Sequence, residues 1–368
     1  MTTRISFDHQ TFELQPYGGI SRYFCELAGR LAAMADCSVN IIAPLHVNEY
    51  LRSVPPAVKK VACYVGKVPK FRRITRTVNN LVVPTLLRRQ HPDIVHRTYY
   101  AAAQTPVPGA RTVITVYDMI HERFHQQMAH LKDAPGKREA IAAADHIICI
   151  SESTRRDLIE IFDVNPANTS VVYLGFDLMS LNDSLEVAMP DRDFLLYVGR
   201  RSGYKNFDGL LAAYSASPRL RENFDVVCFG GGPFDADEMA AIAAASSRAG
   251  AVQQVGGSDA ILRHLYQRAA VFIYPSLYEG FGIPPLEAMS FDCPVVCCSV
   301  SSIPEVVGHA AAFFEPGDAG SMIEAIEHVV DDTAYRANLI QLGHERLKLF
   351  SWQRCAEQTL DVYEKVLA

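Results

Sequence analysis

The sequence predicts an α/β protein made of two domains, each with a parallel sheet covered by helices on both faces. Short apolar runs alternate with amphipathic segments along almost the whole chain, a pattern typical of parallel sheets. The 368 residues suffice for two domains of ordinary size, and residues 178–193 are polar without an apolar period. We therefore expect domains at 1–185 and 186–350, facing each other across a cleft, and a C-terminal helix at 351–368 that packs back toward the first domain.

The first predicted domain begins with a strand, a glycine-containing loop and an amphipathic helix from about Ser21 to Met34. Residues 45–90 look less regular and contain a basic run. Ser151 is expected to cap the helix that follows the predicted strand His146–Ile150. The predicted strands are Arg4–Phe7, Val39–Ala43, Ile94–His96, Thr112–Tyr117, His146–Ile150 and Thr169–Leu174.

A second α/β series follows the polar stretch. Its final part, from Asp318 to Ala368, has the period of helices. The predicted strands are Phe194–Val198, Asp225–Phe229, Ala251–Val255, Val271–Tyr274, Pro294–Cys298 and Ala311–Phe314.

Composition excludes several classes of function. The net charge of −6 argues against nucleic acid as a main partner. No apolar run approaches the length that crosses a bilayer, and the N-terminus lacks a secretory signal pattern. The nine cysteines lie mostly in apolar segments, as expected for reduced thiols. We expect a cytoplasmic protein, with peripheral contact to the inner membrane face left open.

The most informative stretch, residues 275–289, reads PSLYEGFGIPPLEAM. It follows an apolar run typical of a buried strand, and its two glycines, Gly280 and Gly282, predict a tight turn before a helix opened by prolines. Prolines have no N–H, so the amides just before them would be the donors at the positive end of this helix, where anions bind. These amides belong to Phe281, Gly282 and Ile283.

Two carboxylates flank this turn. We expect Glu279 in the loop and Glu287 in the first helical turn, so that both can face one pocket. Carboxylates only accept hydrogen bonds, which suits ligands rich in hydroxyl groups. An acidic first turn is common in helices and would account for Glu287 alone, but not for Glu279 beside the glycine turn.

Positive charge and glycine loops follow other strands. Arg200 and Lys205 bracket a short loop after Phe194–Val198, where they can hold a diphosphate. Gly18 and Gly19 follow the first strand and let backbone amides approach a ligand closely. Gly230–Gly232 lacks the third small residue of a dinucleotide fingerprint, because Asp235 stands there.

The remaining candidates are weaker. Two Asp-x-Asp sequences, at 191–193 and 235–237, do not follow strands, so we expect no metal site. Asp118 and His121 come after a strand and could contact the reacting sugar or the acceptor hydroxyl. Asp8 and His9 are candidates for binding the acceptor, the molecule that would receive a transferred group. The basic run could be a solvated loop or a docking surface for anionic lipid headgroups or a lipid-linked diphosphate; it consists of Lys67, Lys70, Arg72, Arg73 and Arg76.

Together these motifs resemble the retaining glycosyltransferases of family 4, which have the GT-B fold of two facing Rossmann-like domains. The resemblance rests on the spacing of Glu279 and Glu287 within the long motif and spans nearly the whole chain. Three further motifs support it in the right order: YGGISRY at 17–23, Gly199-Arg200 with Lys205-Asn206, and SIPEV at 302–306.

The resemblance implies roles for these positions. Arg200 and Lys205 would hold the diphosphate of the donor, Glu279 would bind the transferred sugar, and Glu287 would take the ribose diol. The Phe281 and Gly282 amides would touch sugar and phosphate, and Gly19 would lie against the phosphates. Transfer would proceed with retention and without a metal, with a leaving phosphate oxygen accepting the proton. Two positions depart from the family: Tyr117 where many members have histidine, and Cys293 where glycine is frequent.

The segment from Phe7 to Tyr23 looks most like mannosyltransferases that build bacterial O-antigen or exopolysaccharide. That implies GDP-mannose or a similar nucleotide sugar as donor and a glycan or lipid-linked oligosaccharide as acceptor. Three alternatives stay open: a sucrose- or trehalose-type synthase with a small soluble acceptor, a non-catalytic sugar-nucleotide-binding protein, and an NAD-dependent oxidoreductase. The sequence itself names neither the nucleobase nor the sugar.

Overall fold

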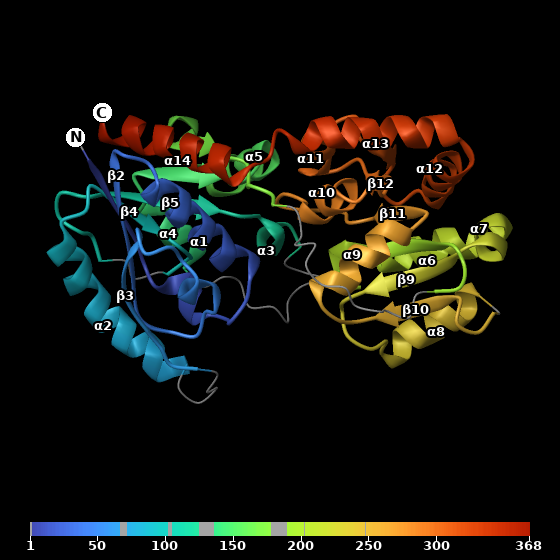
Figure 1. Ribbon diagram of the computed structural model, residues 1–368, viewed down its shortest axis with the longest axis horizontal. Coiled ribbons are helices and arrows are strands. Elements are labelled where there is room, and N and C mark those ends of the chain that lie inside the picture. The colour runs from blue at the N-terminus through green and yellow to red at the C-terminus, as the bar shows by residue number, and fades with distance from the viewer. Residues whose placement is uncertain are drawn as a thin grey trace. The chain divides into compact units, whose positions relative to one another are not determined.

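The computed structural model describes residues 2–66, 72–101, 105–124, 136–177, 190–201, 203–246 and 248–368. The chain divides into two compact units, each with its own sheet (Figure 1). One unit is formed by the N-terminal half, ending at Gly175, together with Phe350–Ala368. The other is formed by Phe176–Leu349.

The first unit is built on a seven-stranded sheet in the order β3-β2-β1-β4-β5-β6-β7, and its strand pairs are parallel. The strands are β1 (Thr3–Phe7), β2 (Cys37–His46), β3 (Lys59–Tyr64), β4 (Ile94–Arg97), β5 (Arg111–Val116), β6 (His146–Cys149) and β7 (Thr169–Val171). The helices are α1 (Gly19–Ala32), α2 (Arg72–Gln90), α3 (Ile120–Arg123), α4 (Lys137–Ala142), α5 (Glu152–Phe162) and α14 (Trp352–Leu367). Short 3-10 turns are η1 (Gln10–Glu13), η2 (Tyr50–Arg52) and η4 (Pro166–Asn168).

The second unit has a six-stranded sheet in the order β10-β9-β8-β11-β12-β13, again with parallel pairs. The strands are β8 (Phe194–Val198), β9 (Asp225–Phe229), β10 (Val252–Val255), β11 (Val271–Tyr274), β12 (Val295–Cys298) and β13 (Ala312–Phe314). The helices are α6 (Phe207–Ala216), α7 (Pro218–Asn223), α8 (Ala236–Ala245), α9 (Asp259–Arg268), α10 (Ile283–Met289), α11 (Ile303–Val307), α12 (Ala319–Asp331) and α13 (Thr333–Leu347), with the 3-10 turn η5 (Gly203–Lys205).

These two parallel sheets confirm the predicted α/β class with two domains. The central strands of the second unit are fully buried and read as continuous apolar runs, because helices cover both faces of the sheet. Ser151 caps α5 as expected, with its Oγ accepting from the Thr154 amide at 3.0 Å. The predicted domain boundary at residue 185 lies outside the described residues.

Residues 45–90 contain more regular structure than their sequence indicates. β3 forms an edge strand, and α2 is one of the longest helices in the unit. The residues that α2 buries recur every four positions, as Thr75, Asn79, Val83 and Leu87. Because two of these four are polar, the helix lacks a clear apolar period, and this part of the expectation was wrong.

The C-terminal helix α14 packs against α1 in the first unit (Figure 1). The hydroxyl of Tyr363 on α14 lies 2.6 Å from Nδ1 of His96, which is fully buried at the end of β4. The other ring nitrogen of His96 is 2.8 Å from the Thr115 hydroxyl on β5. A polar chain therefore ties the last helix of the sequence to the centre of the first sheet.

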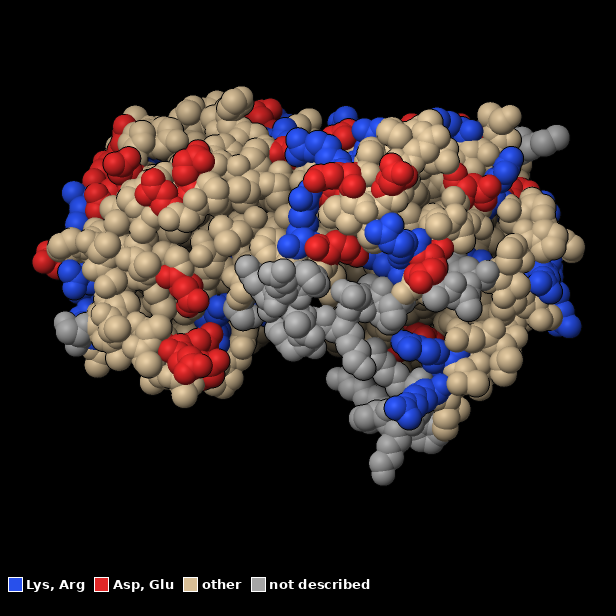
Figure 2. Space-filling view, turned by 180° about the vertical axis from the view of Figure 1, so that it is seen from behind, with Lys and Arg blue, Asp and Glu red and all other residues tan. Residues whose placement is uncertain are grey.

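The surface drawn in Figure 2 carries basic and acidic side chains interspersed in small groups. Mixed signs of this kind create no extended single-sign field on that face. Among the described residues, no helix is both long and apolar enough to span a bilayer.

Candidate active site

Each sheet has one place where the strand order reverses, and in the second unit that place lies between β8 and β11. Ligands of open α/β sheets bind beyond the carboxyl ends of the strands at such a point. The loop after β8 supplies Lys205 and the loop after β11 supplies Glu279, and their side chains meet with Nζ 2.6 Å from Oε1. The structure thus brings together the predicted cation and the predicted carboxylate of this unit.

The Lys205–Glu279 pair is partly shielded from water. The Lys205 side chain is 21% exposed and the Glu279 side chain 10% exposed. Tyr274, at the end of β11, lies with its ring 5.9 Å from Nζ of Lys205. Burial, together with the Glu279 carboxylate, raises the pKa of Tyr274 well above its usual value, so this hydroxyl stays a neutral donor.

Backbone contacts hold the two loops together. The amide of Leu277 donates to the carbonyl of Tyr204 at 2.7 Å, and the Asn206 side chain donates to the carbonyl of Pro275 at 3.2 Å. Asn206 has a φ of 54°, a left-handed conformation that asparagine tolerates better than most residues. Lys205 is therefore positioned by neighbours on both sides rather than by its own ion pair alone.

The predicted motif at residues 302–306 contacts the backbone of the Glu279 loop. The Ser302 hydroxyl lies 2.8 Å from the Glu279 carbonyl and 2.7 Å from the Phe281 carbonyl, and Ser302 is fully buried. The Glu279 amide donates to the Ser301 hydroxyl at 2.8 Å. A buried serine that bridges carbonyls explains why this motif accompanies the glycine turn.

Helix α10 begins as expected but places its acid elsewhere. Gly282 is the N-cap, with a φ of 117° that favours glycine, and two prolines follow Ile283. Glu287 lies in the second turn, not in the first as the sequence indicated, because the helix starts one residue before the prolines. The hydroxyl of Tyr266 is 3.2 Å from its Oε2, so the Glu287 carboxylate is held from the α9 side.

Of two adjacent arginines after β8, one is exposed and one is buried. Arg200, the predicted phosphate ligand, is exposed. Arg201, which sequence reasoning missed, is 7% exposed, and its guanidinium binds the Glu238 carboxylate and the carbonyls of Gly230 and Gly232. A Cβ on Gly231 would lie 2.5 Å from this guanidinium. Close packing against Arg201 thus accounts for Gly231, and all three glycines of the loop have positive φ values, between 72° and 86°, which favour glycine.

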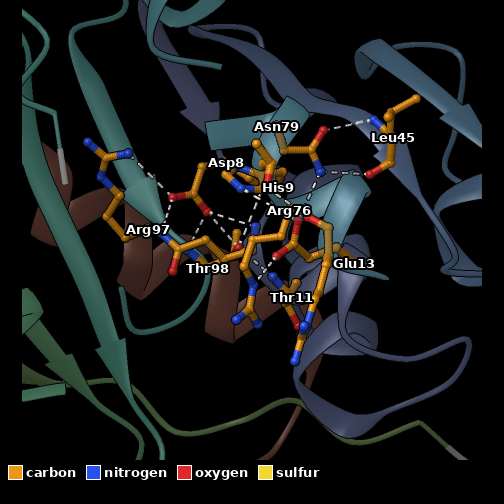
Figure 3. Close-up of polar contacts among 12 residues, drawn as sticks. Asp8, His9, Thr11, Glu13, Leu45, Arg76, Asn79, Arg97 and Thr98 are labelled. Carbon is orange, nitrogen blue, oxygen red and sulfur yellow. Dashed lines mark hydrogen bonds and ion pairs between the residues drawn. The ribbon is translucent and has the colours of Figure 1, made fainter. Parts of the chain in front are cut away.

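The strand order of the first unit reverses between β1 and β4, and Asp8 fills that point (Figure 3). Asp8 is fully buried. Its Oδ1 accepts from the Thr98 amide at 2.9 Å and the Thr98 hydroxyl at 2.7 Å, and its Oδ2 lies 3.4 Å from Arg97. Burial alone would raise the pKa of Asp8, but Arg97, His9 and the Thr98 bonds outweigh it and hold that pKa below its usual value. These contacts favour a structural role over direct contact with an acceptor.

His9, Glu13 and α2 form a second polar group beside Asp8 (Figure 3). The His9 Nε2 is 3.7 Å from the Glu13 carboxylate, which also accepts from Asn79 at 3.0 Å and Arg76 at 3.3 Å. Arg76 of the predicted basic run is thus partly used within the protein. Arg73 is exposed on the first turn of α2, where Arg72 also lies, whereas residues 67 and 70 fall outside the described ranges.

The remaining predicted residues lie in loops of the first unit. Asp118 is half-buried after β5, where its Oδ1 accepts from the Ile120 amide at 3.0 Å, and His121 follows on the short helix α3. Tyr117, in the position where histidine is frequent, is buried and its hydroxyl has no hydrogen-bond partner among the described residues. Gly18 caps α1 in an extended conformation, and Gly19 is its first residue with open space around the Cβ position.

Two α/β units, each with a parallel sheet, are the architecture of the GT-B class of glycosyltransferases. The model of the group 1 glycosyl transferases matches residues 186–346, and that of glycosyltransferase family 4 matches residues 17–179. The chain therefore belongs to the family 4 glycosyltransferases.

Individual relatives agree with this assignment. O-antigen chain mannosyltransferase B of Escherichia coli is 27% identical over 95% of this chain and 96% of its own length. A sucrose-phosphate synthase from Thermosynechococcus elongatus shares the fold with a TM-score of 0.74 at 19% identity, each chain covered to 99%. Anabaena HepE in complex with UDP and glucose gives a TM-score of 0.72 at 17% identity, covering 99% of this chain and 100% of that one.

Proposed function

We propose that this glycosyltransferase moves mannose from GDP-mannose to a glycan or lipid-linked oligosaccharide with retention of the anomeric configuration. The observation that carries the proposal is the Lys205–Glu279 pair at the β8/β11 switch point. A sugar diphosphate carries its charge directly beside a neutral polyhydroxyl ring. A site for it needs a cation and a hydrogen-bond acceptor side by side, and this pair supplies both.

Each donor-binding residue then has a separate role. Lys205, with exposed Arg200, neutralises the diphosphate, and Glu279 accepts hydrogen bonds from the hydroxyl groups of the mannose. The turn from Gly280 to Ile283 lets the phosphates and sugar approach the backbone closely, because Gly282 has no Cβ. Glu287, oriented by Tyr266, takes the ribose diol.

The proposed reaction breaks the bond between the anomeric carbon and the diphosphate oxygen and forms a bond to the acceptor oxygen on the same face. The acceptor hydroxyl gives its proton to the departing phosphate oxygen, so no side chain has to serve as a general base. Lys205 and Arg200 stabilise the charge that builds on the leaving diphosphate, which is the main contribution asked of the protein. Asp118 and His121 are proposed to contact the acceptor hydroxyl or the reacting sugar.

The choice of mannose rests on the E. coli relative, whose name is that of an O-antigen chain mannosyltransferase. It also supports a place in cell-surface polysaccharide assembly, such as lipopolysaccharide O-antigen or exopolysaccharide. The choice of a guanine nucleotide follows from mannose as the sugar.

A transfer assay tests the proposal. Purified protein is incubated with GDP-mannose and a mannose-terminated lipid-linked oligosaccharide, and the product linkage is read by NMR. The expected product carries an α-linked mannose, formed equally well with and without EDTA. A β-linkage would contradict retention, loss of activity in EDTA would contradict metal independence, and transfer of glucose in preference to mannose would contradict the donor.

An acceptor on a lipid surface would explain the exposed side of α2. The helix carries Arg73, Arg88 and Arg89 and no acidic residue, although the protein as a whole is acidic. Ile74 is 54% exposed and Leu81 is 73% exposed. The two side chains lie about two helical turns apart on the outward face of the helix. We propose that this face rests on anionic lipid headgroups, with arginines on phosphates and the apolar side chains at the acyl boundary.

Co-sedimentation with vesicles of anionic phospholipid checks this contact. The variant Arg73→Glu with Leu81→Ser is expected to bind several-fold less, since each lost basic residue removes about 1 kcal/mol of surface attraction. Arg268→Glu, an exposed change on α9 of the second unit, is the matched control. Equal binding of both variants would contradict the proposed membrane contact and favour the alternative of a small soluble acceptor.

A further inference from the structure

An open surface pocket of about 440 Å³ lies in the first unit, between the loop before α1 and the turn η2. Tyr17, Glu49, Tyr50, Arg52 and Ser53 line it. Its volume falls in the range of small-molecule sites, roughly 300–1,000 Å³. None of these five residues has a part in the donor site proposed above.

The walls of this tyrosine pocket are fixed by a buried asparagine. Asn48 is fully buried, and its side-chain amide donates to the carbonyls of Gln15 and Pro16 at 3.2 and 3.1 Å and to the Ser21 hydroxyl at 2.8 Å. The backbone amide of Glu49 adds a bond to the Pro16 carbonyl at 2.9 Å. The two loops that form the pocket are therefore joined before any ligand arrives, which lowers the cost of binding.

The polar groups of the pocket form a neutral set. The Glu49 carboxylate accepts from Arg52 at 2.9 Å and from the Tyr64 hydroxyl at 2.5 Å. Arg52 also lies over the Tyr64 ring, 5.0 Å from its centroid. The charges of Arg52 and Glu49 cancel each other, so the pair presents polar groups to a hydroxyl-bearing ligand without attracting an anion.

The rim of the pocket is aromatic. Tyr17 is 59% exposed, unusually so for a large side chain in a folded protein, and it meets Tyr50 edge-on with ring centroids 5.4 Å apart. An exposed, oriented tyrosine ring offers a flat apolar face beside polar groups. A hexose has the matching surface, with C–H groups on one face and hydroxyl groups around its edge.

We infer that the tyrosine pocket binds a neutral hexose unit of the acceptor glycan, with Tyr17 on the apolar face of the sugar and the Glu49–Arg52 pair on its hydroxyl groups. The identity of the ligand as part of the acceptor rests on the proposed transferase function. The pocket would hold the acceptor by a sugar and so add to its affinity without entering the chemistry.

Saturation-transfer NMR on the full chain without nucleotide tests this inference, with methyl α-D-mannopyranoside and an α-linked mannotriose as probes. The unchanged protein is expected to bind both, and Tyr17→Ala to weaken binding about fivefold or more, for the apolar contact that is lost. Tyr17→Phe keeps the ring and is expected to retain binding. Met239→Ala, an exposed change on α8 of the second unit, controls for nonspecific effects of removing a surface side chain.

Three results would overturn the inference: no binding of either probe, equal binding by Tyr17→Ala and the unchanged protein, or displacement of the probes by inorganic phosphate. Thermal unfolding of each variant confirms that the protein is folded. Because no donor is present, the result is separate from the transfer assay, in which the proposed function stands or fails by itself.

Discussion

At the scale of residues, both switch points are occupied by oppositely charged pairs, but the two differ in exposure. Asp8 and Arg97 are 0% and 7% exposed, whereas Lys205 remains 21% exposed. In the first unit the Asp8 carboxylate is fully enclosed and accepts hydrogen bonds from Thr98, Gln10 and Arg97, so it holds the loops after β1 and β4 together. A pair that is partly open can exchange its internal partner for a ligand. The same position in two similar sheets thus serves structure in one unit and, as we propose, binding in the other.

Replacement of Asp8 by asparagine is expected to lower the free energy of unfolding by about 3 kcal/mol, because it leaves Arg97 buried without its partner. Since the pKa of Asp8 is held below its usual value, the stabilisation is present at neutral pH and is lost as the pH falls below about 3.8. Urea unfolding at pH 7 measures the effect. A change below about 0.5 kcal/mol would show that the pair contributes little.

His96 predicts a different pH dependence. Burial lowers the pKa of this histidine to about 3, so between pH 3 and its ordinary value near 6.5 the unfolded chain binds a proton that the folded chain does not. Stability should therefore fall as the pH is lowered through this window, by up to about 1.4 kcal/mol per pH unit. His96→Gln should flatten the slope measured between pH 5 and 7. An unchanged slope would mean that other groups carry it.

At the scale of elements, the sequence predicted strands better than helices or turns. Apolar runs such as Val271–Tyr274 are unmistakable because parallel strands are buried on both faces. Helix α2 was missed because Thr75 and Asn79 occupy its inner face, and Asn79 is there to bond Glu13 and the backbone of Leu45. Glu287 was placed one turn too early because helix boundaries depend on cap geometry, which proline positions alone do not set.

Much of the candidate site was also visible in the sequence. Lys205 and Glu279 were both named, but their contact depends on how the loops after β8 and β11 fold together. Arg201 was not predicted, because an arginine that follows a strand is usually solvated. Its partners are Glu238 and three carbonyls of the glycine loop, and only the fold brings them near. Nothing in the local sequence around Asn48 indicated that it joins the walls of the tyrosine pocket.

Helix α14 supplies a prediction at this scale. Its first residue, Trp352, crosses Gly175 so closely that a Cβ there would lie 2.5 Å from the Trp352 backbone. Gly175→Ala is therefore expected to destabilise the protein by at least about 2 kcal/mol, since backbone cannot move aside as a side chain can. Gly256→Ala, where the nearest atom would be a side-chain nitrogen at 3.7 Å, is the control. Equal thermal stability of the two variants would contradict the packing of α14.

At the scale of the whole molecule, we propose different binding roles for the two units. The second unit carries the residues that we propose bind the donor, and the first carries the tyrosine pocket and the exposed basic face of α2. A donor site contained in one unit predicts that nucleotides alone bind. Thermal unfolding with GDP, UDP, ADP and TDP should show the largest rise in midpoint with GDP, because a ligand of the folded state stabilises it by mass action. A larger rise of the midpoint with UDP would indicate that the donor is a UDP-linked sugar and not GDP-mannose.

Kinetics of two single variants test whether Lys205 and Glu279 together hold the sugar diphosphate. Lys205→Ala and Glu279→Ala are each expected to reduce kcat/KM for GDP-mannose by about a hundredfold or more, because each removes a charged contact to the donor. Lys205→Ala should also weaken binding of GDP, whereas Glu279→Ala should leave GDP affinity nearly unchanged, since that carboxylate contacts the sugar. Transfer rates equal to those of the unchanged protein in both variants would show that this pair does not hold the donor.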